Sequence, residues 1–258
     1  MLELNKIHLV DCIEGMGQLD DNSCNLCFTS PPYNCGNKGK NKDMYKFYGD
    51  NLPDDEYYNL LNNSLKQMLR VCSGPIFVNL NYVKNNTQSL YRFVSDNSQY
   101  LLETIIWDKE TCQPPIGNIL GKRFEFIFLF AKDKFELNCY GRNAGHNKGE
   151  NYKNIFGNWI SNLIKVPKDD TKNSKVHRAG FPVSLPKVFI DIYTKPNDVI
   201  LDPFMGTGST AVAATDIGRR FVGFELSPEY VEISNKRIEE AKTKLVQIKD
   251  QLELVLNE

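Results

Sequence analysis

The sequence lacks any apolar run of about 18 residues, the length that a helix needs to span a membrane. Its first residues, Met1 to Lys6, contain no apolar segment of the kind found in signal peptides, so we expect a cytoplasmic protein with no membrane partner. It also lacks an excess of either charge, because the formal net charge is −1 over 258 residues. A nucleic-acid partner would therefore have to be bound by a local basic patch.

A cysteine framework is missing as well. The seven cysteines are irregularly spaced, and Cys24 and Cys27 form a C-x-x-C pair with no second pair or histidine cluster to complete a metal site. We therefore expect reduced, buried cysteines and no metal ion.

The sequence does contain an alternation of short apolar runs and amphipathic segments. This alternation predicts an α/β fold in which a mostly parallel sheet carries helices on both faces. With 41% hydrophobic residues, the chain can form one substantial domain with a small insertion. The expected strands are 5–10, 26–28, 75–80, 101–107, 123–130, 199–201 and 221–224, and the expected helices are 54–71, 87–94, 184–193, 211–217 and a long one from 228.

Residues 29–34, Thr-Ser-Pro-Pro-Tyr-Asn, follow an expected strand and are the first candidate site. Proline has a fixed φ and no backbone N–H, so the two prolines direct their carbonyls outward at the strand end. Ser30 adds a hydroxyl, Pro31 a carbonyl acceptor and Tyr33 an aromatic face. These groups suit a flat ring that bears an amino group, although Pro-Pro-Tyr can also be an ordinary turn.

The second candidate site is the glycine-rich segment Asp202-Pro-Phe-Met-Gly-Thr-Gly208, which joins an expected strand to an expected helix. Glycines let a ligand approach the backbone, and Glu225, at the tip of the next strand and outside the core, can accept both hydroxyls of a ribose. The pattern indicates a cofactor that contains adenosine. Because Gly206, Gly208 and Ala211 also match the loose pattern of nicotinamide-binding turns, an oxidoreductase is an alternative.

Two further features of the sequence each allow two interpretations. Asp11, at the end of the first expected strand, is either a ligand-binding carboxylate or the N-cap of a following helix. In the long C-terminal helix, apolar residues from Ile238 to Val255 alternate spacings of three and four. This seam fits a coiled coil with a second copy or another partner, and equally a helix that lies on its own domain.

Residues 138–178 show no clear periodicity and are locally basic, with aromatic residues among the basic ones. Such a composition is typical of a nucleic-acid surface, and it also fits a solvated surface subdomain. The polar loop 35–50 beside the first candidate site adds further lysines. The candidate nucleic-acid-binding residues are Lys38, Lys42, Arg142, Lys165, Lys168, Lys172 and Lys175.

With Ser30-Pro-Pro-Tyr33 early and the glycine-rich segment late, the chain resembles a β-class amino-group DNA methyltransferase, in which the catalytic half precedes the cofactor half. Ile106-Trp-Asp-Lys109, His177-Arg-Ala-Gly-Phe-Pro182 and Gly218 to Glu225 extend the resemblance over nearly the whole chain. It implies a circularly permuted, Rossmann-like fold. Its implied parts are a catalytic half (1–137), a target-recognition insert (138–178), a cofactor-binding half (179–235) and a C-terminal helix (236–258).

The resemblance also implies the ligands and the residues that bind them. S-adenosylmethionine (AdoMet) would be the methyl donor, S-adenosylhomocysteine the product and double-stranded DNA of a prokaryotic cell the substrate, with a restriction endonuclease as a further expected partner. The implied catalytic residues are Ser30, Pro31, Pro32 and Tyr33, and the implied cofactor-binding residues are Asp11, Cys12, Phe181, Asp202, Pro203, Phe204, Gly206, Gly208 and Glu225.

The chemistry implied is methylation of an exocyclic amine on a base that has left the duplex. Ser30 and the Pro31 carbonyl would accept its N–H groups, and Tyr33 would stack on the base through its ring, so we expect Tyr33→Phe to be mild. Ser30 as the first motif residue favours N4 of cytosine, with N6 of adenine as the alternative. A cytosine-C5 enzyme would need a Pro-Cys dipeptide, which the sequence does not contain.

Overall fold

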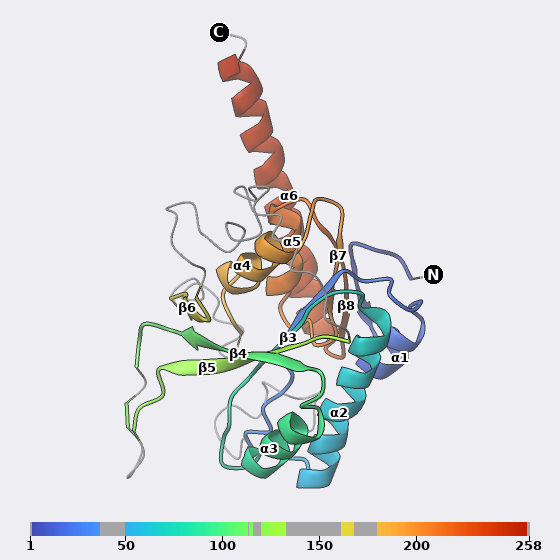
Figure 1. The fold of residues 1–258 in the computed structure, drawn as a ribbon. Coiled ribbons are helices and arrows are strands. Elements are labelled where there is room, and N and C mark those ends of the chain that lie inside the picture. The colour runs from blue at the N-terminus through green and yellow to red at the C-terminus, as the bar shows by residue number, and fades with distance from the viewer. Residues whose placement is uncertain are drawn as a thin grey trace, which may run out of the picture.

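The computed structural model describes residues 2–36, 50–112, 114–115, 120–132, 161–167 and 180–256 (Figure 1). An eight-stranded sheet forms the middle layer, and helices cover both of its faces. The strands are β1 (Lys6–Leu9), β2 (Leu26–Thr29), β3 (Ile76–Leu80), β4 (Leu101–Asp108), β5 (Phe124–Phe130), β6 (Leu163–Lys165), β7 (Val199–Asp202) and β8 (Arg220–Glu225). The helices are α1 (Cys12–Gly17), α2 (Asp54–Val71), α3 (Thr87–Asp96), α4 (Ser184–Tyr193), α5 (Ser209–Asp216) and α6 (Pro228–Leu256).

The strands lie in the order β1-β8-β7-β2-β3-β5-β4-β6. β5 runs antiparallel to its neighbours β3 and β4, and every other neighbouring pair is parallel. The prediction of an α/β fold with a mostly parallel sheet is therefore confirmed. α2 connects β2 to β3 and α5 connects β7 to β8, as the crossover between two parallel strands requires.

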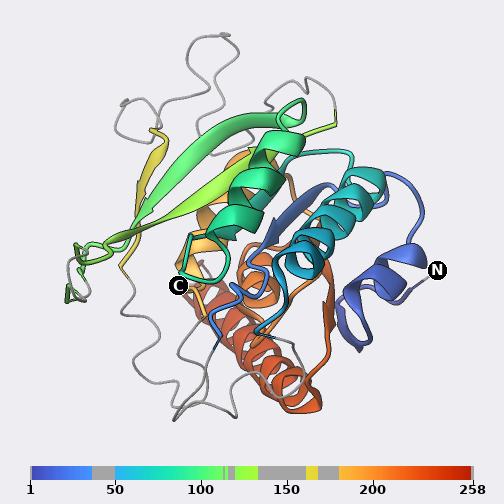
Figure 2. The ribbon, with the colours of Figure 1, turned by 90° about the horizontal axis from the view of Figure 1, so that it is seen from below.

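Each face of the sheet has its own hydrophobic core. Because successive residues of a strand point to opposite faces, Ile76 and Val78 of β3 belong to the core with α1, α2 and α3, whereas Phe77 belongs to the core with α4, α5 and α6. Figures 1 and 2 show these two groups of helices on opposite sides of the sheet. A strand that is covered on both faces has apolar residues at every position, which explains the continuous apolar runs in the sequence.

The expected bounds of α2 and α4 are confirmed, because both helices have a strongly amphipathic pattern. α5 begins at Ser209, two residues earlier than expected, directly after Gly208. Residues 138–178 show no clear periodicity, yet they contain β6, which pairs in parallel with the end of β4. Three residues are too few to show a period, and the strand is held by the Trp107 indole N–H, which donates to the Val166 carbonyl at 2.8 Å. Residues 138–160 and 168–178 lie outside the described residues.

The predicted apolar seam of α6 has a buried part and an exposed part. Ile238 and Ala241 are buried in the domain's own core, so the first part of the helix lies on its own domain. Further along, Val246 is 57% and Ile248 43% exposed, and Figure 1 shows the helix leaving the body of the molecule. No helix in the described part of the chain, α6 included, is both long and apolar enough to cross a membrane.

The described cysteines form no disulfide. Cys12, Cys24, Cys27 and Cys72 are buried, as expected, whereas Cys35 is exposed at the end of the Ser-Pro-Pro-Tyr segment. Burial raises the pKa of the Cys12 thiol to about 12, and the Asp11 carboxylate beside it adds to the rise. Cys12 is therefore a neutral thiol at physiological pH.

Candidate active site

The two candidate motifs meet where the order of the strands reverses. β8, which follows β7 along the chain, lies on one side of β7, whereas β2, with its successor β3 beyond it, lies on the other side. β7 and β2 are parallel neighbours, with Leu26 paired to Ile200 and Cys27 to Leu201, so their carboxyl ends lie side by side. In open α/β sheets, ligands bind in the crevice at this reversal point.

Asp202 joins the two motifs. The hydroxyl of Thr29, at the end of β2, donates to Asp202 Oδ1 at 2.7 Å across 173 residues of sequence. Thr210 donates its hydroxyl to Oδ2 at 2.7 Å, and the Phe204 N–H donates to Oδ1 at 3.0 Å. Asp202 has no exposed surface, so its carboxylate lies inside the protein, where these hydrogen bonds tie the end of β2 to the glycine-rich segment.

Asp202→Asn is expected to make folding less sensitive to pH. Burial raises the pKa of Asp202 to about 7, and the Glu225 charge adds to the rise, while the donors Thr29, Thr210 and Phe204 oppose it. The folded protein thus binds more protons than the unfolded chain between about pH 4 and pH 7. Through this group the free energy of unfolding falls as the pH rises across that window, by at most about 4 kcal/mol.

Because asparagine does not titrate, the free energy of unfolding of Asp202→Asn relative to the wild type should rise by about 2 kcal/mol between about pH 5 and pH 8. Denaturant titrations of the ligand-free proteins at both pH values measure this difference. A difference that stays constant with pH would show that Asp202 is ionised throughout.

The glycine-rich turn depends on positive φ angles at Gly206 (53°) and Gly208 (83°). A Cβ on Gly208 would lie 2.9 Å from the Cβ of Ser234 on α6, so the turn and the helix can pack only around a glycine. A Cβ on Gly206 would meet only the Phe204 carbonyl oxygen, at 3.9 Å, so a ligand can approach this backbone closely. The Ser234 hydroxyl donates to the Gly206 carbonyl at 2.8 Å and holds α6 to the turn.

Glu225, at the end of β8, supports the same turn. Its Oε2 accepts the Gly206 N–H at 2.8 Å, and its Oε1 accepts the N–H groups of Leu226 at 2.9 Å and Ser227 at 2.8 Å. The side chain is only 2% exposed. Our expectation that Glu225 lies outside the core is therefore wrong, because the carboxylate satisfies three backbone donors inside the protein.

A small hollow beside the turn brings five of the predicted cofactor-binding residues together. Its walls come from Val10, Asp11, Cys12, Leu60, Pro203, Phe204, Glu225 and Leu226. Asp11 is also the N-cap of α1, where its Oδ1 accepts the Ile13 N–H at 2.8 Å. The N-cap interpretation of Asp11 is thus confirmed, and the residue borders the hollow as well.

Phe181 lies on the opposite face of the sheet from this hollow. Its ring packs edge-on against Phe28 at 5.3 Å between centroids, within the core shared with α4 and α5. Its carbonyl accepts the Ser209 hydroxyl at 2.9 Å at the start of α5. Phe181 is therefore anchored next to the glycine-rich turn, although most of its ring is buried.

The Ser-Pro-Pro-Tyr segment is held from below by α2 and by the N-cap of α3. The Tyr57 hydroxyl donates to the Pro32 carbonyl at 2.7 Å, and Asn86 Nδ2 donates to the Tyr33 carbonyl at 2.7 Å. The Pro32 carbonyl therefore has a donor inside the protein, whereas no donor to the Pro31 carbonyl is found among the described residues.

The Tyr33 hydroxyl has partners that the sequence did not suggest. It donates to Glu125 Oε2 at 2.7 Å and accepts from Asn79 Nδ2 at 3.0 Å. Lys109 Nζ donates to the other oxygen of Glu125, Oε1, at 2.9 Å. Burial raises the pKa of Tyr33 well above its ordinary value, and the Glu125 charge adds to the rise. The sequence assigned a role only to the Tyr33 ring, and the structure adds these partners of its hydroxyl.

Residues 24–236 match the family model for N6 and N4 DNA methylases, which is described as DNA methylase. The chain belongs to this DNA methylase family. It is thus an amino-group DNA methyltransferase, and the oxidoreductase alternative is wrong.

Among the relatives of this methylase, Type II methyltransferase M.HinfI of Haemophilus influenzae is 29% identical over 262 residues, which cover 93% of this chain and 69% of M.HinfI. Type II methyltransferase M.BglII of Bacillus subtilis is 26% identical over 258 residues, or 90% of this chain and 68% of M.BglII. The chain matches only 28% of the length of the Type II beta methyltransferase M.BslI of a Bacillus species, at 27% identity over 92% of its own residues.

Two solved structures show the fold of the methylase. PvuII DNA methyltransferase (cytosine-N4-specific) superposes with a TM-score of 0.69 at 22% identity, covering 92% of this chain and 89% of that one. A Thermus thermophilus protein solved in complex with S-adenosyl-L-methionine gives a TM-score of 0.64 at 22% identity, covering 92% of this chain and 95% of that one. The predicted Rossmann-like methyltransferase fold is confirmed.

The residues that sequence reasoning missed in the methylase are Asn79, Lys109 and Glu125. Glu125 is the one acidic residue of β5, within the aromatic run Phe124 to Phe130, and a charge in a buried strand needs a partner. That signal could have marked Glu125 as part of a site. Its partners come from β3 and from the residue after β4, and only the order of the strands brings them together.

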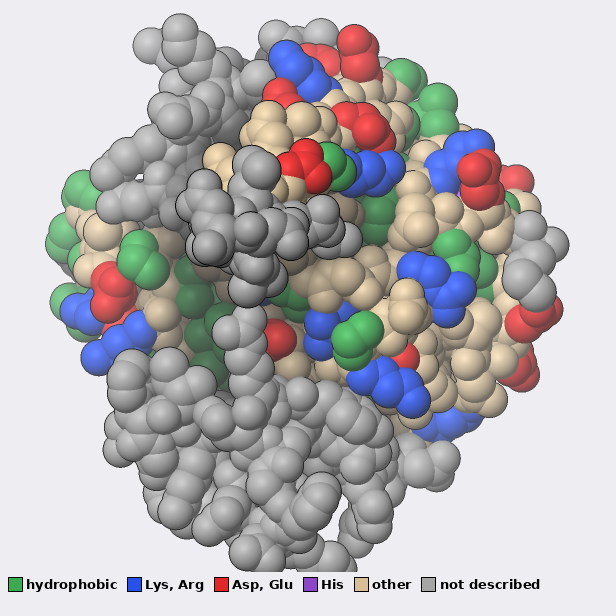
Figure 3. Space-filling view, turned by 90° about the horizontal axis from the view of Figure 1, so that it is seen from above, with side chains coloured by type: hydrophobic (Ala, Val, Ile, Leu, Met, Phe, Trp, Pro, Cys, Tyr) green, Lys and Arg blue, Asp and Glu red, His purple; other side chains and the backbone are tan. Residues whose placement is uncertain are grey.

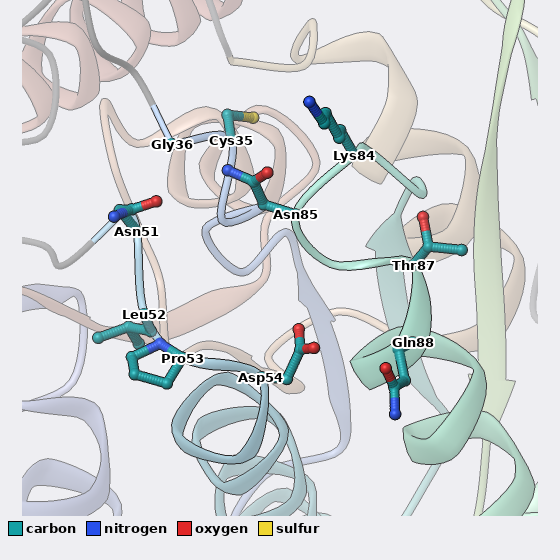
Figure 4. A pocket seen from close by; sticks show the side chains of 10 residues that line it. All are labelled: Cys35, Gly36, Asn51, Leu52, Pro53, Asp54, Lys84, Asn85, Thr87 and Gln88. Carbon is teal, nitrogen blue, oxygen red and sulfur yellow. The ribbon is translucent and has the colours of Figure 1, made fainter.

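An open cavity of about 910 Å³ lies beside the Ser-Pro-Pro-Tyr segment (Figure 4). In Figure 4, the residues that follow Tyr33 and those that lead into α2 form one side, and the residues at the start of α3 form the other. Its lining is mostly polar and consists of Cys35, Gly36, Asn51, Leu52, Pro53, Asp54, Lys84, Asn85, Thr87 and Gln88.

Of the predicted DNA-binding residues, the structure describes Lys165 alone. Lys165 is exposed and is the last residue of β6. Because β6 runs parallel to β4, this residue lies on the side of the sheet where the parallel strands end, which is also the side of the crevice. On the face drawn in Figure 3, Lys and Arg side chains of the described residues are interspersed with Asp and Glu. The remaining predicted residues, Lys38, Lys42, Arg142, Lys168, Lys172 and Lys175, lie outside the described residues.

Proposed function

We propose that this methylase transfers the methyl group of AdoMet to N4 of a cytosine that has left duplex DNA. The observation that supports the proposal is the Thr29–Asp202 hydrogen bond of 2.7 Å, because it ties the residue before Ser30 to the first residue of the glycine-rich segment. A methyl donor bound at the turn and an amine held at Ser30 would then meet in one crevice.

The residues around the glycine-rich turn fit the adenosine part of AdoMet. The Gly206 backbone is open to close approach, and Glu225 borders the hollow beside the turn, where its carboxylate would accept a ribose hydroxyl. Asp11, Cys12, Pro203 and Phe204 would border the ligand through the hollow they share with Glu225. When bound, AdoMet supplies an electrophilic methyl group on a sulfonium sulfur.

The Ser-Pro-Pro-Tyr segment would prepare the amine. The lone pair of an exocyclic amine is delocalised into the base, which makes the nitrogen a poor nucleophile. Ser30 Oγ and the Pro31 carbonyl would accept its two N–H groups and draw the nitrogen toward tetrahedral geometry, with its lone pair directed at the methyl group. Tyr33 would stack on the extruded base and offset part of the cost of unstacking it, which is a few kcal/mol.

Cytosine N4 is preferred to adenine N6 because the first motif residue is Ser30. The PvuII enzyme, whose fold this chain shares, is described as cytosine-N4-specific. Adenine N6 is the second candidate, because the family includes both kinds of enzyme.

Transfer of labelled methyl from AdoMet to duplex DNA, followed by nucleoside analysis, tests this function. We expect N4-methylcytosine, and sequencing of DNA from cells that express the protein would give the site. N6-methyladenine would overturn the choice of base, and no transfer to any DNA would overturn the proposed function.

We also propose that the range 138–178 reads the DNA target, between a catalytic half at 1–137 and a cofactor half at 179–235. A restriction endonuclease that cuts the same sequence and a helical partner on the exposed part of α6 are further proposals, the latter because Val246 and Ile248 are exposed there. Sedimentation of the protein with and without residues 243–258 would detect a homodimer formed by this segment.

Lys165→Ala is expected to reduce the slope of log DNA affinity against log salt by about one, because one phosphate contact is lost. Lys132→Ala is the matched control. Lys132 bonds Asn22 on the side of the sheet where the parallel strands begin, away from the crevice, so this variant should leave the slope unchanged. Fluorescence anisotropy over a series of salt concentrations measures both slopes. Equal slopes for Lys165→Ala and the wild type would mean that the DNA does not reach β6.

A further inference from the structure

The Tyr33 hydroxyl is the centre of a partly buried hydrogen-bond network. Its oxygen lies 2.7 Å from Glu125 Oε2, 3.0 Å from Asn79 Nδ2 and 3.4 Å from Ser30 Oγ. Lys109 Nζ lies 2.9 Å from Glu125 Oε1, and the two side chains are 6% and 14% exposed. The network therefore links an ion pair inside the protein to the serine that begins the catalytic motif.

The charge of Glu125 sets the direction of every hydrogen bond in this network. Burial favours the neutral acid, but the Lys109 ammonium, together with the donors Tyr33 and Asn79, outweighs it and lowers the pKa of Glu125. A carboxylate can only accept, so Tyr33 must donate its single hydrogen to Glu125. The Tyr33 oxygen is then left with acceptor capacity alone, and Asn79 and Ser30 must donate to it.

This direction determines what Ser30 can offer a substrate. A serine hydroxyl has one hydrogen and two lone pairs. If the hydrogen points to Tyr33, the lone pairs remain for the N–H groups of an exocyclic amine. The Ser30–Tyr33 distance of 3.4 Å is long for a hydrogen bond between hydroxyls, so this contact is the weakest in the network.

We propose that Glu125 and Lys109 are positioning residues for methyl transfer, which act through the Tyr33 hydroxyl to keep Ser30 Oγ an acceptor and the Tyr33 ring fixed. This inference rests on the proposed function, because it takes Ser30 as the acceptor for the target amine. It requires only an exocyclic amine and therefore holds for cytosine and for adenine.

Glu125→Gln is the decisive variant, because it keeps the shape of the side chain and reverses the network. Lys109 can only donate, so the glutamine must turn its carbonyl oxygen to Lys109 and its NH₂ group to Tyr33. Tyr33 then accepts from glutamine and donates to Ser30, whose own hydrogen turns toward the amine. Tyr33→Phe removes the hydroxyl oxygen that forms hydrogen bonds with both Glu125 and Ser30, and it leaves the Glu125–Lys109 ion pair intact.

The experiment is a double-mutant cycle of Glu125→Gln and Tyr33→Phe. It measures the single-turnover rate of methyl transfer from labelled AdoMet to a duplex with the sequence methylated in expressing cells, at saturating AdoMet and DNA. We expect each single variant to be about tenfold to hundredfold slower than the wild type, with a DNA dissociation constant changed less than about threefold. The double variant should be no slower than the slower single variant, because both changes interrupt the same path.

Arg123→Gln is the matched control. Arg123, the residue before β5, forms an ion pair at 2.7 Å with Asp108 at the end of β4. Its guanidinium bonds this carboxylate rather than the Tyr33 network, so we expect Arg123→Gln to methylate at the wild-type rate. If Glu125→Gln does not fold because Lys109 is left unpaired, Glu125→Gln/Lys109→Met restores a neutral pair and takes its place in the cycle. Thermal unfolding of each variant confirms that it is folded.

Multiplying rate factors in the double variant would overturn the inference, because Glu125 would then act independently of the Tyr33 hydroxyl. A wild-type rate for Tyr33→Phe would overturn it as well. Both outcomes differ from failure of the proposed function, in which the wild-type protein itself would transfer no methyl group to DNA.

Discussion

Ser30→Ala is expected to slow methyl transfer by about two orders of magnitude while weakening DNA binding less than about threefold. The Ser30 hydroxyl would matter most as the amine nitrogen becomes tetrahedral, so its loss should raise the barrier and leave the ground state almost unchanged. Single-turnover methylation measures the rate, and the fluorescence of 2-aminopurine at the target position reports whether the base still leaves the duplex.

Two variants make this prediction specific. Ser73→Ala removes a hydroxyl on the side of the sheet where the parallel strands begin, away from the crevice. There it bonds the Cys24 carbonyl, so the variant should methylate at the wild-type rate. Tyr33→Ala should fail differently, because losing a base–aromatic stack costs about 1–3 kcal/mol in retention of the flipped base. A wild-type rate for Ser30→Ala would leave the Pro31 carbonyl as the acceptor that activates the amine.

Glu225→Ala is expected to weaken AdoMet binding by about a hundredfold and also to lower the free energy of unfolding by about 3 kcal/mol. The first effect follows from losing the acceptor for the ribose. The second follows from the structure, because the backbone N–H groups of Gly206, Leu226 and Ser227 would lose their common acceptor. Calorimetric titration with AdoMet measures the first effect, and urea unfolding measures the second.

Glu232→Ala is the control for Glu225→Ala. Glu232 is exposed on α6, so its removal changes the net charge by the same amount without touching the turn. We expect the affinity for AdoMet and the stability of Glu232→Ala to match those of the wild type. An unchanged dissociation constant in folded Glu225→Ala would remove Glu225 from the cofactor site, whatever its effect on stability.

The sequence alone determined the features that local chemistry encodes. Apolar residues at helical spacing predicted α2 and α4 with their observed bounds, since such a pattern has only one helix face to bury. Two prolines after an apolar run and glycines between a strand and a helix predicted the two motifs, because these residues permit few backbone conformations. Since the motifs also resemble those of a known family, the sequence predicted the class of reaction as well.

The tertiary structure decided which distant residues meet, because the order of strands in a sheet depends on packing and not on local periodicity. It placed Thr29 on Asp202 across 173 residues, turned Glu225 from a surface carboxylate into a buried one, and added β6 at the edge of the sheet. It also brought Glu125 to Tyr33. The Tyr33 hydroxyl therefore has a partner that no spacing in the sequence could predict, because β5 lies beside β3 only in the folded sheet.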